Sequence, residues 1–78
     1  MNDDARALLR FFYDTKQAAR WPSHGQAALQ NAADVLGLPF DDALALADDL
    51  EREGLLTQDY LDFGHVITAA GEAVIQHD

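Results

Sequence analysis

Two glycines divide the middle of this chain into segments of helical length. Residues 32–56 read AADVLGLPFDDALALADDLEREGLL. Gly37 and Gly54 each follow a run with helical spacing, where the end of a helix needs a residue that tolerates positive φ. Pro39 prevents the first helix from continuing and suits the start of the next one. This stretch therefore predicts a helix, a tight turn, a second helix and a stop that leads into a strand.

The second helix of this stretch can be phased from its apolar residues. With Leu50 at the centre of the buried face, a period of 3.6 residues places four more residues close to that face. They are Ala43, Leu46, Ala47 and Gly54. The opposite, outward face is predicted to carry Asp41, Leu44, Ala45, Asp48 and Arg52.

The flanking residues predict further elements on both sides. Residues 3–20 predict a first helix, and a helix capped by Ser23 is expected over residues 25–36. Pro22 favours an extended link at Trp21. Apolar runs on either side of Asp62-Phe63-Gly64 predict a short hairpin over about residues 55–67, and Thr68 is expected to cap a last helix over about residues 68–77. The predicted buried stripes are Ala5, Leu8, Leu9, Phe12 and Ala19 in the first helix and Leu29, Ala32, Ala33 and Leu36 in the second.

The spacing from Ala32 to Leu55 resembles the helix-turn-helix of a winged-helix domain. Its recurring positions are an Ala-Asp pair, Leu-Gly-Leu, Ala43, Leu46-Ala47, Leu50 and Gly54-Leu55. Residues 66–71, VITAAG, are similar to the strand-then-helix step that follows the wing in many members. The resemblance covers about residues 3–77. It implies that residues 1–78 form one small α+β domain with three helices, a β-hairpin wing and a C-terminal helix, in which the helix-turn-helix spans about residues 25–54.

The resemblance also implies DNA binding, with the second helix of the motif in the major groove and the wing on the backbone. The charge distribution argues against it. The chain has 14 acidic and five basic residues and a net charge of −9, and after Trp21 its only lysine or arginine is Arg52. Because cations that neutralise phosphates dominate affinity for nucleic acid, we do not expect the isolated domain to bind duplex DNA. Arg52 alone, on the predicted outward face, can make a charged bidentate contact with guanine.

A protein-binding surface is the interpretation that the outward face favours. Leu44 and Ala45 form a small apolar centre, and Asp41 and Asp48 lie beside it with Arg52. Such a face suits a protein partner with a basic or mixed surface. A DNA-binding regulator is the alternative, and an acidic protein that imitates DNA is a further one.

Other function classes find little support in the sequence. The chain has no cysteine, and His24, His65 and His77 lack the spacing of a metal site, so neither a metal nor a cofactor is expected. The acidic pairs are adjacent in sequence, so their side chains diverge on a helix, and an enzyme is not expected. No apolar run has the length of a membrane span, and a cytoplasmic protein without membrane contact is expected. The aromatic residues expected to supply much of the core are Phe11, Phe12, Trp21, Phe40, Tyr60 and Phe63.

Overall fold

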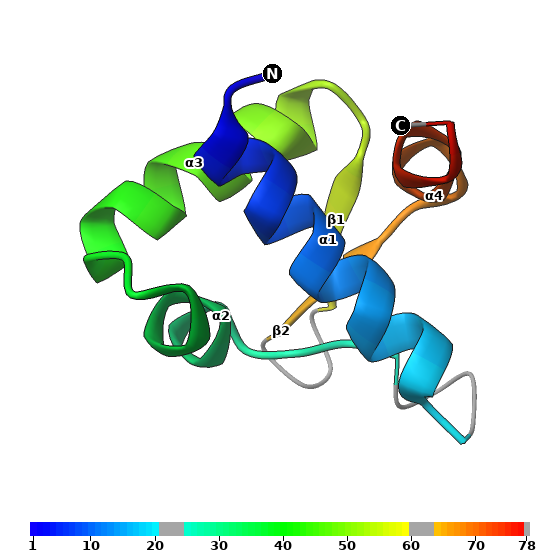
Figure 1. Ribbon diagram of the computed structural model, residues 1–78, viewed down its shortest axis with the longest axis horizontal. Helices are drawn as coiled ribbons and strands as arrows, with labels where there is room; N and C mark the ends of the chain where they lie inside the picture. Colours follow the sequence, from blue (N-terminus) through cyan, green and yellow to red (C-terminus); the bar gives the residue numbers. More distant parts are fainter. Residues whose placement is uncertain (21–24, 60–63, 78) are drawn as a thin grey trace.

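The chain folds into an α+β domain, described by a computed structural model for residues 1–20, 25–59 and 64–77 (Figure 1). This part of the chain contains four helices and a two-stranded antiparallel hairpin. In order they are α1 (Asp3–Ala18), α2 (Leu29–Leu36), α3 (Phe40–Arg52), β1 (Leu56–Asp59), β2 (Gly64–Ile67) and α4 (Ala69–Gln76). The α+β class and the order of elements agree with the prediction.

Helix α1 lies at the centre of the arrangement. It packs against α2, α3, β2 and α4, and Figure 1 shows it crossing in front of the strands. The side chain of Asn2 accepts a hydrogen bond from the backbone N–H of Ala5 at 2.7 Å, which caps the first turn. Its buried residues are Ala5, Leu8, Leu9 and Phe12, as predicted, whereas Ala19 lies just beyond the helix and is half-buried.

Helix α2 begins four residues later than the sequence predicted. Ala27 is in an antiparallel bridge with His65 of β2, and the two residues exchange backbone hydrogen bonds of 2.9 and 2.8 Å. A residue whose backbone groups pair with a strand cannot use them in a helix, so the chain is extended up to the N-cap, Ala28. The N-cap of α2 is therefore Ala28, and Ser23, the predicted cap, lies outside the described residues. The extended link predicted at Trp21 lies outside the described residues.

Both predicted glycine stops are confirmed. Gly37 has a φ of 69° and Gly54 a φ of 76°, which lie in the left-handed region. After each glycine the next residue reaches back to the helix that has just ended. The N–H of Leu38 donates to the carbonyl of Ala33, and the N–H of Leu55 donates to that of Leu50, both at 2.9 Å. These paired bonds set the directions in which α3 and β1 leave.

The hairpin pairs β1 with β2 in the register Leu56↔Ile67 to Asp59↔Gly64. Gly64 belongs to β2 and not to the predicted turn, and Asp62 and Phe63 lie outside the described residues. Ala27 pairs with the other edge of β2, so β2 has a partner on each side. The sheet is therefore wider than the predicted hairpin by one short bridge.

The core joins α1, α2, α3, both strands and α4. Leu50 is 1% exposed and Ala43 and Ala47 are fully buried, which confirms the phase predicted for α3; Leu46 is half-buried and Gly54 exposed. Helix α4 begins at the predicted cap, since the hydroxyl of Thr68 accepts from the N–H of Gly71 at 3.1 Å.

The aromatic residues contribute less to the described core than expected. Phe12 is fully buried and Phe11 packs partly against the core, but Phe40 is 40% exposed, so its predicted place in the core is wrong. Trp21, Tyr60 and Phe63 lie outside the described residues. Small alanines of α2 and α3, fully buried at positions 32, 33, 43 and 47, allow these helices to approach closely without large aromatic rings between them.

Candidate interaction surface

The outward face of α3 lies where the phase of the helix placed it. Asp41, Leu44, Ala45 and Arg52 are exposed, and Asp48 is half-buried. Leu44 is 42% exposed, although leucine side chains are usually buried. The five predicted interaction residues thus share one side of the helix opposite Leu50.

Phe40 adds a second apolar side chain to this face, and the sequence analysis missed it. It is the first residue of α3 and precedes Leu44 by four residues, so both lie on the same side of the helix, one turn apart. Phe40 and Leu44 are two of the four large apolar residues that are exposed in the described chain, and we call them the apolar pair. The spacing of four residues between them can be read from the sequence. Phe40 was nevertheless assigned to the core, because aromatic residues were expected to fill it.

Carboxylates predominate among the charged side chains of α3. Helix α3 carries Asp41 and Asp42 in its first turn and Asp48, Asp49 and Glu51 in its second half, against the single cation Arg52. The guanidinium of Arg52 lies 3.1 Å from the carboxylate of Asp49, and both side chains are largely exposed. Asp41, Asp42 and Asp48 have no ion pair within the part of the chain that the structure describes. Their negative charge is therefore not balanced locally.

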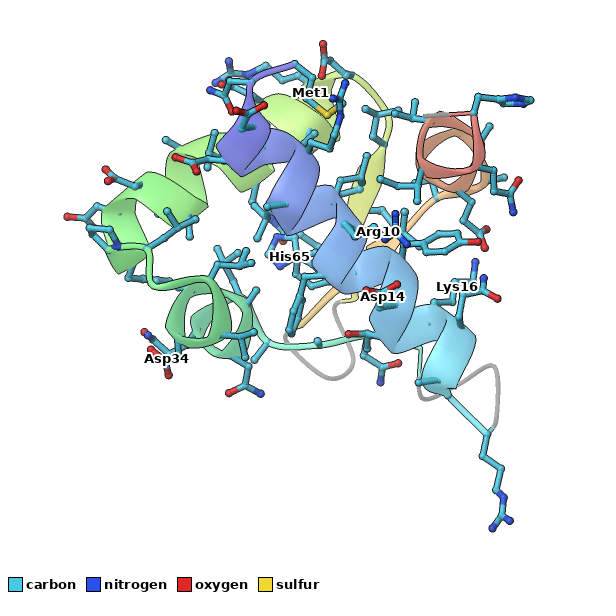
Figure 2. All side chains as sticks on the ribbon, viewed as in Figure 1. Met1, Arg10, Asp14, Lys16, Asp34 and His65 are labelled. Carbon is cyan, nitrogen blue, oxygen red and sulfur yellow. The ribbon has the colours of Figure 1, made fainter. Side chains whose placement is uncertain are left out.

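Arg10 and Lys16 of α1 have acidic partners outside α3. Arg10 lies 3.6 Å from Asp14 and 5.9 Å from the centre of the Tyr13 ring. Lys16 contacts Glu72 of α4 at 3.1 Å, and Gln17 donates to the same carboxylate. Figure 2 shows Arg10, Asp14 and Lys16 following one another along α1, with Asp34 on α2 well apart. These contacts pair Arg10 within α1 and Lys16 with α4.

A buried histidine fixes the far end of α3 to the sheet. Nε2 of His65 on β2 lies 2.9 Å from Oε1 of Glu51, and the two side chains are 11% and 24% exposed. The contact does not have the geometry of a hydrogen bond, and Nδ1 of His65 has no hydrogen-bond partner among the described residues. The His65 ring also lies against Phe12, with 6.0 Å between ring centres, and Figure 2 shows it behind α1. No local pattern in the sequence indicates this pair, because Glu51 and His65 are on different elements.

The Glu51–His65 pair joins α3 to β2. Among the described residues no group of three or more histidine or acidic side chains is arranged to hold a metal ion. A pocket of about 350 Å³ lies elsewhere, between the start of α1 and the second half of α3, and its polar lining includes the paired Asp49 and Arg52. In that pocket the guanidinium of Arg52 lies 3.1 Å from the carboxylate of Asp49.

Comparisons with known proteins identify no relative. No protein family matches this sequence, and no curated protein or solved structure is significantly similar to it. Across residues 1–20, 25–59 and 64–77, none of the helices combines the length and the apolar character that crossing a bilayer requires.

Proposed function

We propose that this chain is a non-enzymatic, acidic winged-helix-like module that recognises another protein through the outward face of α3. The observation that carries the proposal is the apolar pair, Phe40 and Leu44, exposed one turn apart within a helix that has five carboxylates and one arginine. Exposed apolar side chains that share one face favour a protein partner. Burying them against that partner removes apolar surface from water, which lowers the free energy of the complex.

The order of the elements supports the winged-helix part of the proposal. A first helix, a strand-like bridge at Ala27, two helices joined by a tight turn, a hairpin and a final helix follow one another in the manner that the sequence resemblance implies. In this arrangement α3 corresponds to the helix that meets the ligand. We also propose a cytoplasmic location, since the chain contains no cysteine that an oxidising compartment would pair.

The charges of α3 favour a protein over DNA as the ligand. The one arginine on its outward face is paired with Asp49 at 3.1 Å, and a contact with guanine would have to break that pair. Asp41 and Asp48 would lie close to phosphates in the groove without any cation of α3 to offset the repulsion. The same carboxylates would attract lysine and arginine side chains on a protein.

The experiment is capture of binding partners from a lysate of the native organism by the immobilised chain. Leu44→Lys is the test variant, because it puts a cation at the centre of the apolar pair without touching the core. Ala73→Lys is the matched control, with the same charge change at an exposed alanine of α4. We expect wild type and Ala73→Lys to capture the same protein and Leu44→Lys to lose it, with equal thermal melts for all three. If Leu44→Lys captures the same protein as wild type, the proposal that the partner binds the outward face of α3 is refuted.

Titration with mixed-sequence duplex DNA tests the alternative. At about 0.15 M salt we expect no binding at micromolar protein. Micromolar or tighter binding that weakens as salt is added would show that the chain is a DNA-binding domain and not the proposed module.

A further inference from the structure

We infer that the partner docks on α3 as a cationic amphipathic helix, with two apolar residues one turn apart that contact Phe40 and Leu44 and with lysine or arginine on its flanks. This inference rests on the proposed function and names the class of its ligand. It follows from the spacing of the apolar pair and from the unpaired carboxylates beside it.

The spacing fits a helix. Phe40 and Leu44 are four residues apart, which is about 6 Å along the axis of α3. Residues at i and i+4, or i and i+3, of a second helix have a matching separation and can pack their ridge against this one. The apolar pair alone does not exclude an extended strand, because alternate residues of a strand are also separated by nearly the same distance.

The carboxylates distinguish a helix from a strand. Asp41 lies beside Phe40 on the outer side of α3, so a cation that reaches it must flank the apolar side chains of the partner. Asp48 continues the row of Phe40 and Leu44 by one more turn. In a helix, residues next to an apolar stripe lie on its flanks. In a strand the neighbours of each inward residue point to the opposite face, away from α3. A helical partner therefore brings cations to Asp41 beside the row as well as to Asp48 along it, whereas the inward face of a strand presents cations along its own line only.

The charge balance selects a cationic partner over a second copy of the chain. Asp41, Asp42 and Asp48 have no ion pair among the described residues, whereas Arg10, Lys16 and Arg52 are each already paired within the chain. Each copy has a net charge of −9, so two copies repel one another at low salt. A segment rich in lysine or arginine gains the attraction that a second copy lacks.

The test uses two synthetic peptides of about 18 residues, long enough to form a helix in an alanine-rich background. The patterned peptide has leucines four residues apart along one face and lysines on both flanks. The control peptide has the same composition and charge, but its leucines are distributed around the helix. Binding of the labelled peptides to the full chain is measured by fluorescence anisotropy at about 0.15 M salt, and amide NMR shifts locate the site.

We expect the patterned peptide to bind with amide shifts centred on residues 40–48, and the control peptide to bind roughly tenfold more weakly or worse. Leu44→Ser should weaken the patterned peptide by a similar factor, and Ala73→Ser should leave it unchanged. The double variant Asp41→Asn, Asp48→Asn should weaken binding and reduce its dependence on salt.

Equal binding of the two peptides would mean that charge alone attracts them and would overturn the inference. The inference would also be overturned if Leu44→Ser bound the patterned peptide as tightly as wild type, or if wild type did not bind that peptide at all. The lysate experiment separates these failures from that of the proposed function. If capture depends on Leu44 while the patterned peptide does not bind, the surface is right and the helical partner is wrong. If capture does not depend on Leu44, the proposed function itself fails.

Discussion

Leu44 and Leu50 are the same residue type on one helix, and their surroundings give them opposite roles. Leu50 is 1% exposed and packs in the core, whereas Leu44 is 42% exposed on the outward face. Six residues of a helix turn the chain by about 600°, which places the two side chains on different sides of α3. Leu50 therefore stabilises the fold, whereas the side chain of Leu44 is accessible from solvent.

Substitution of these two leucines should affect the stability of the fold to very different extents. We expect Leu50→Ala to lower the free energy of unfolding by about 2–5 kcal/mol, because it removes buried methyl groups and leaves a cavity. The matched substitution Leu44→Ala should lower it by about 1 kcal/mol or less, since much of that side chain is already in water. Urea unfolding followed by circular dichroism measures both. Similar losses for the two variants would show that the phase assigned to α3 is wrong.

The Glu51–His65 pair should contribute to stability as a unit. Its atoms are 2.9 Å apart in a mostly buried place, so removal of either partner leaves the other poorly solvated. We expect the single variants Glu51→Ala and His65→Ala to be non-additive, with a coupling free energy of about 0.5–3 kcal/mol in a double-mutant cycle. Additive losses would indicate that the two side chains are neighbours without an energetic connection.

Single residues also show where prediction from the sequence stops. The outward face of α3 followed from a 3.6-residue period, because the phase of one helix is a local property. Phe40 was assigned to the core by residue type, and the packing of small alanines between α2 and α3 left its ring on the surface. The Glu51–His65 contact depends on how α3 and β2 meet, and no local pattern encodes that geometry.

At the scale of elements, the helix ends set by local backbone conformation were predicted correctly, whereas the helix start set by a tertiary strand pairing was not. Gly37 and Gly54 ended their helices as predicted, because positive φ at a helix end is a requirement of the backbone itself. The start of α2 was misplaced because Ala27 pairs with His65, a residue far along the chain. The hairpin and α4 were predicted to within about two residues, which is the usual uncertainty of element boundaries.

Gly71 tests how closely α4 approaches the sheet. A Cβ atom at this position would lie 2.6 Å from Cγ1 of Ile67 and would also collide with the carbonyl oxygen of Leu55. We expect Gly71→Ala to lower the free energy of unfolding by about 1–3 kcal/mol through overpacking. Helix propensity alone predicts the opposite, a gain of about 0.5–1 kcal/mol.

The exposed Ala70 is the control for this comparison. Ala70→Gly should show only the loss of helix propensity, of about 0.5–1 kcal/mol. A chain stabilised by Gly71→Ala in the same chemical unfolding assay would show that α4 is not packed as closely as the structure places it.

At the scale of the whole molecule, the charge is both abundant and unevenly distributed. Four of the five basic residues lie in the first 20 positions, and α3 carries five carboxylates. Self-repulsion of this kind destabilises the compact state and is screened by salt. We therefore expect the melting temperature at pH 7 to rise between low salt and about 0.15 M sodium chloride. A flat or falling response in differential scanning calorimetry would argue against net repulsion.

The same charge distribution underlies the proposal that α3 binds a protein, and site-specific crosslinking in living cells of the native organism tests this proposal most directly. A photoreactive phenylalanine analogue would replace Ala45, which is exposed beside Leu44, and Ala73 of α4 in a control. We predict a discrete crosslink to one protein from position 45, none from position 73, and loss of the product when Leu44→Lys is added. Crosslinks from position 45 to nucleic acid, or to a protein from position 73 alone, would contradict the assignment of α3 as a protein-binding surface.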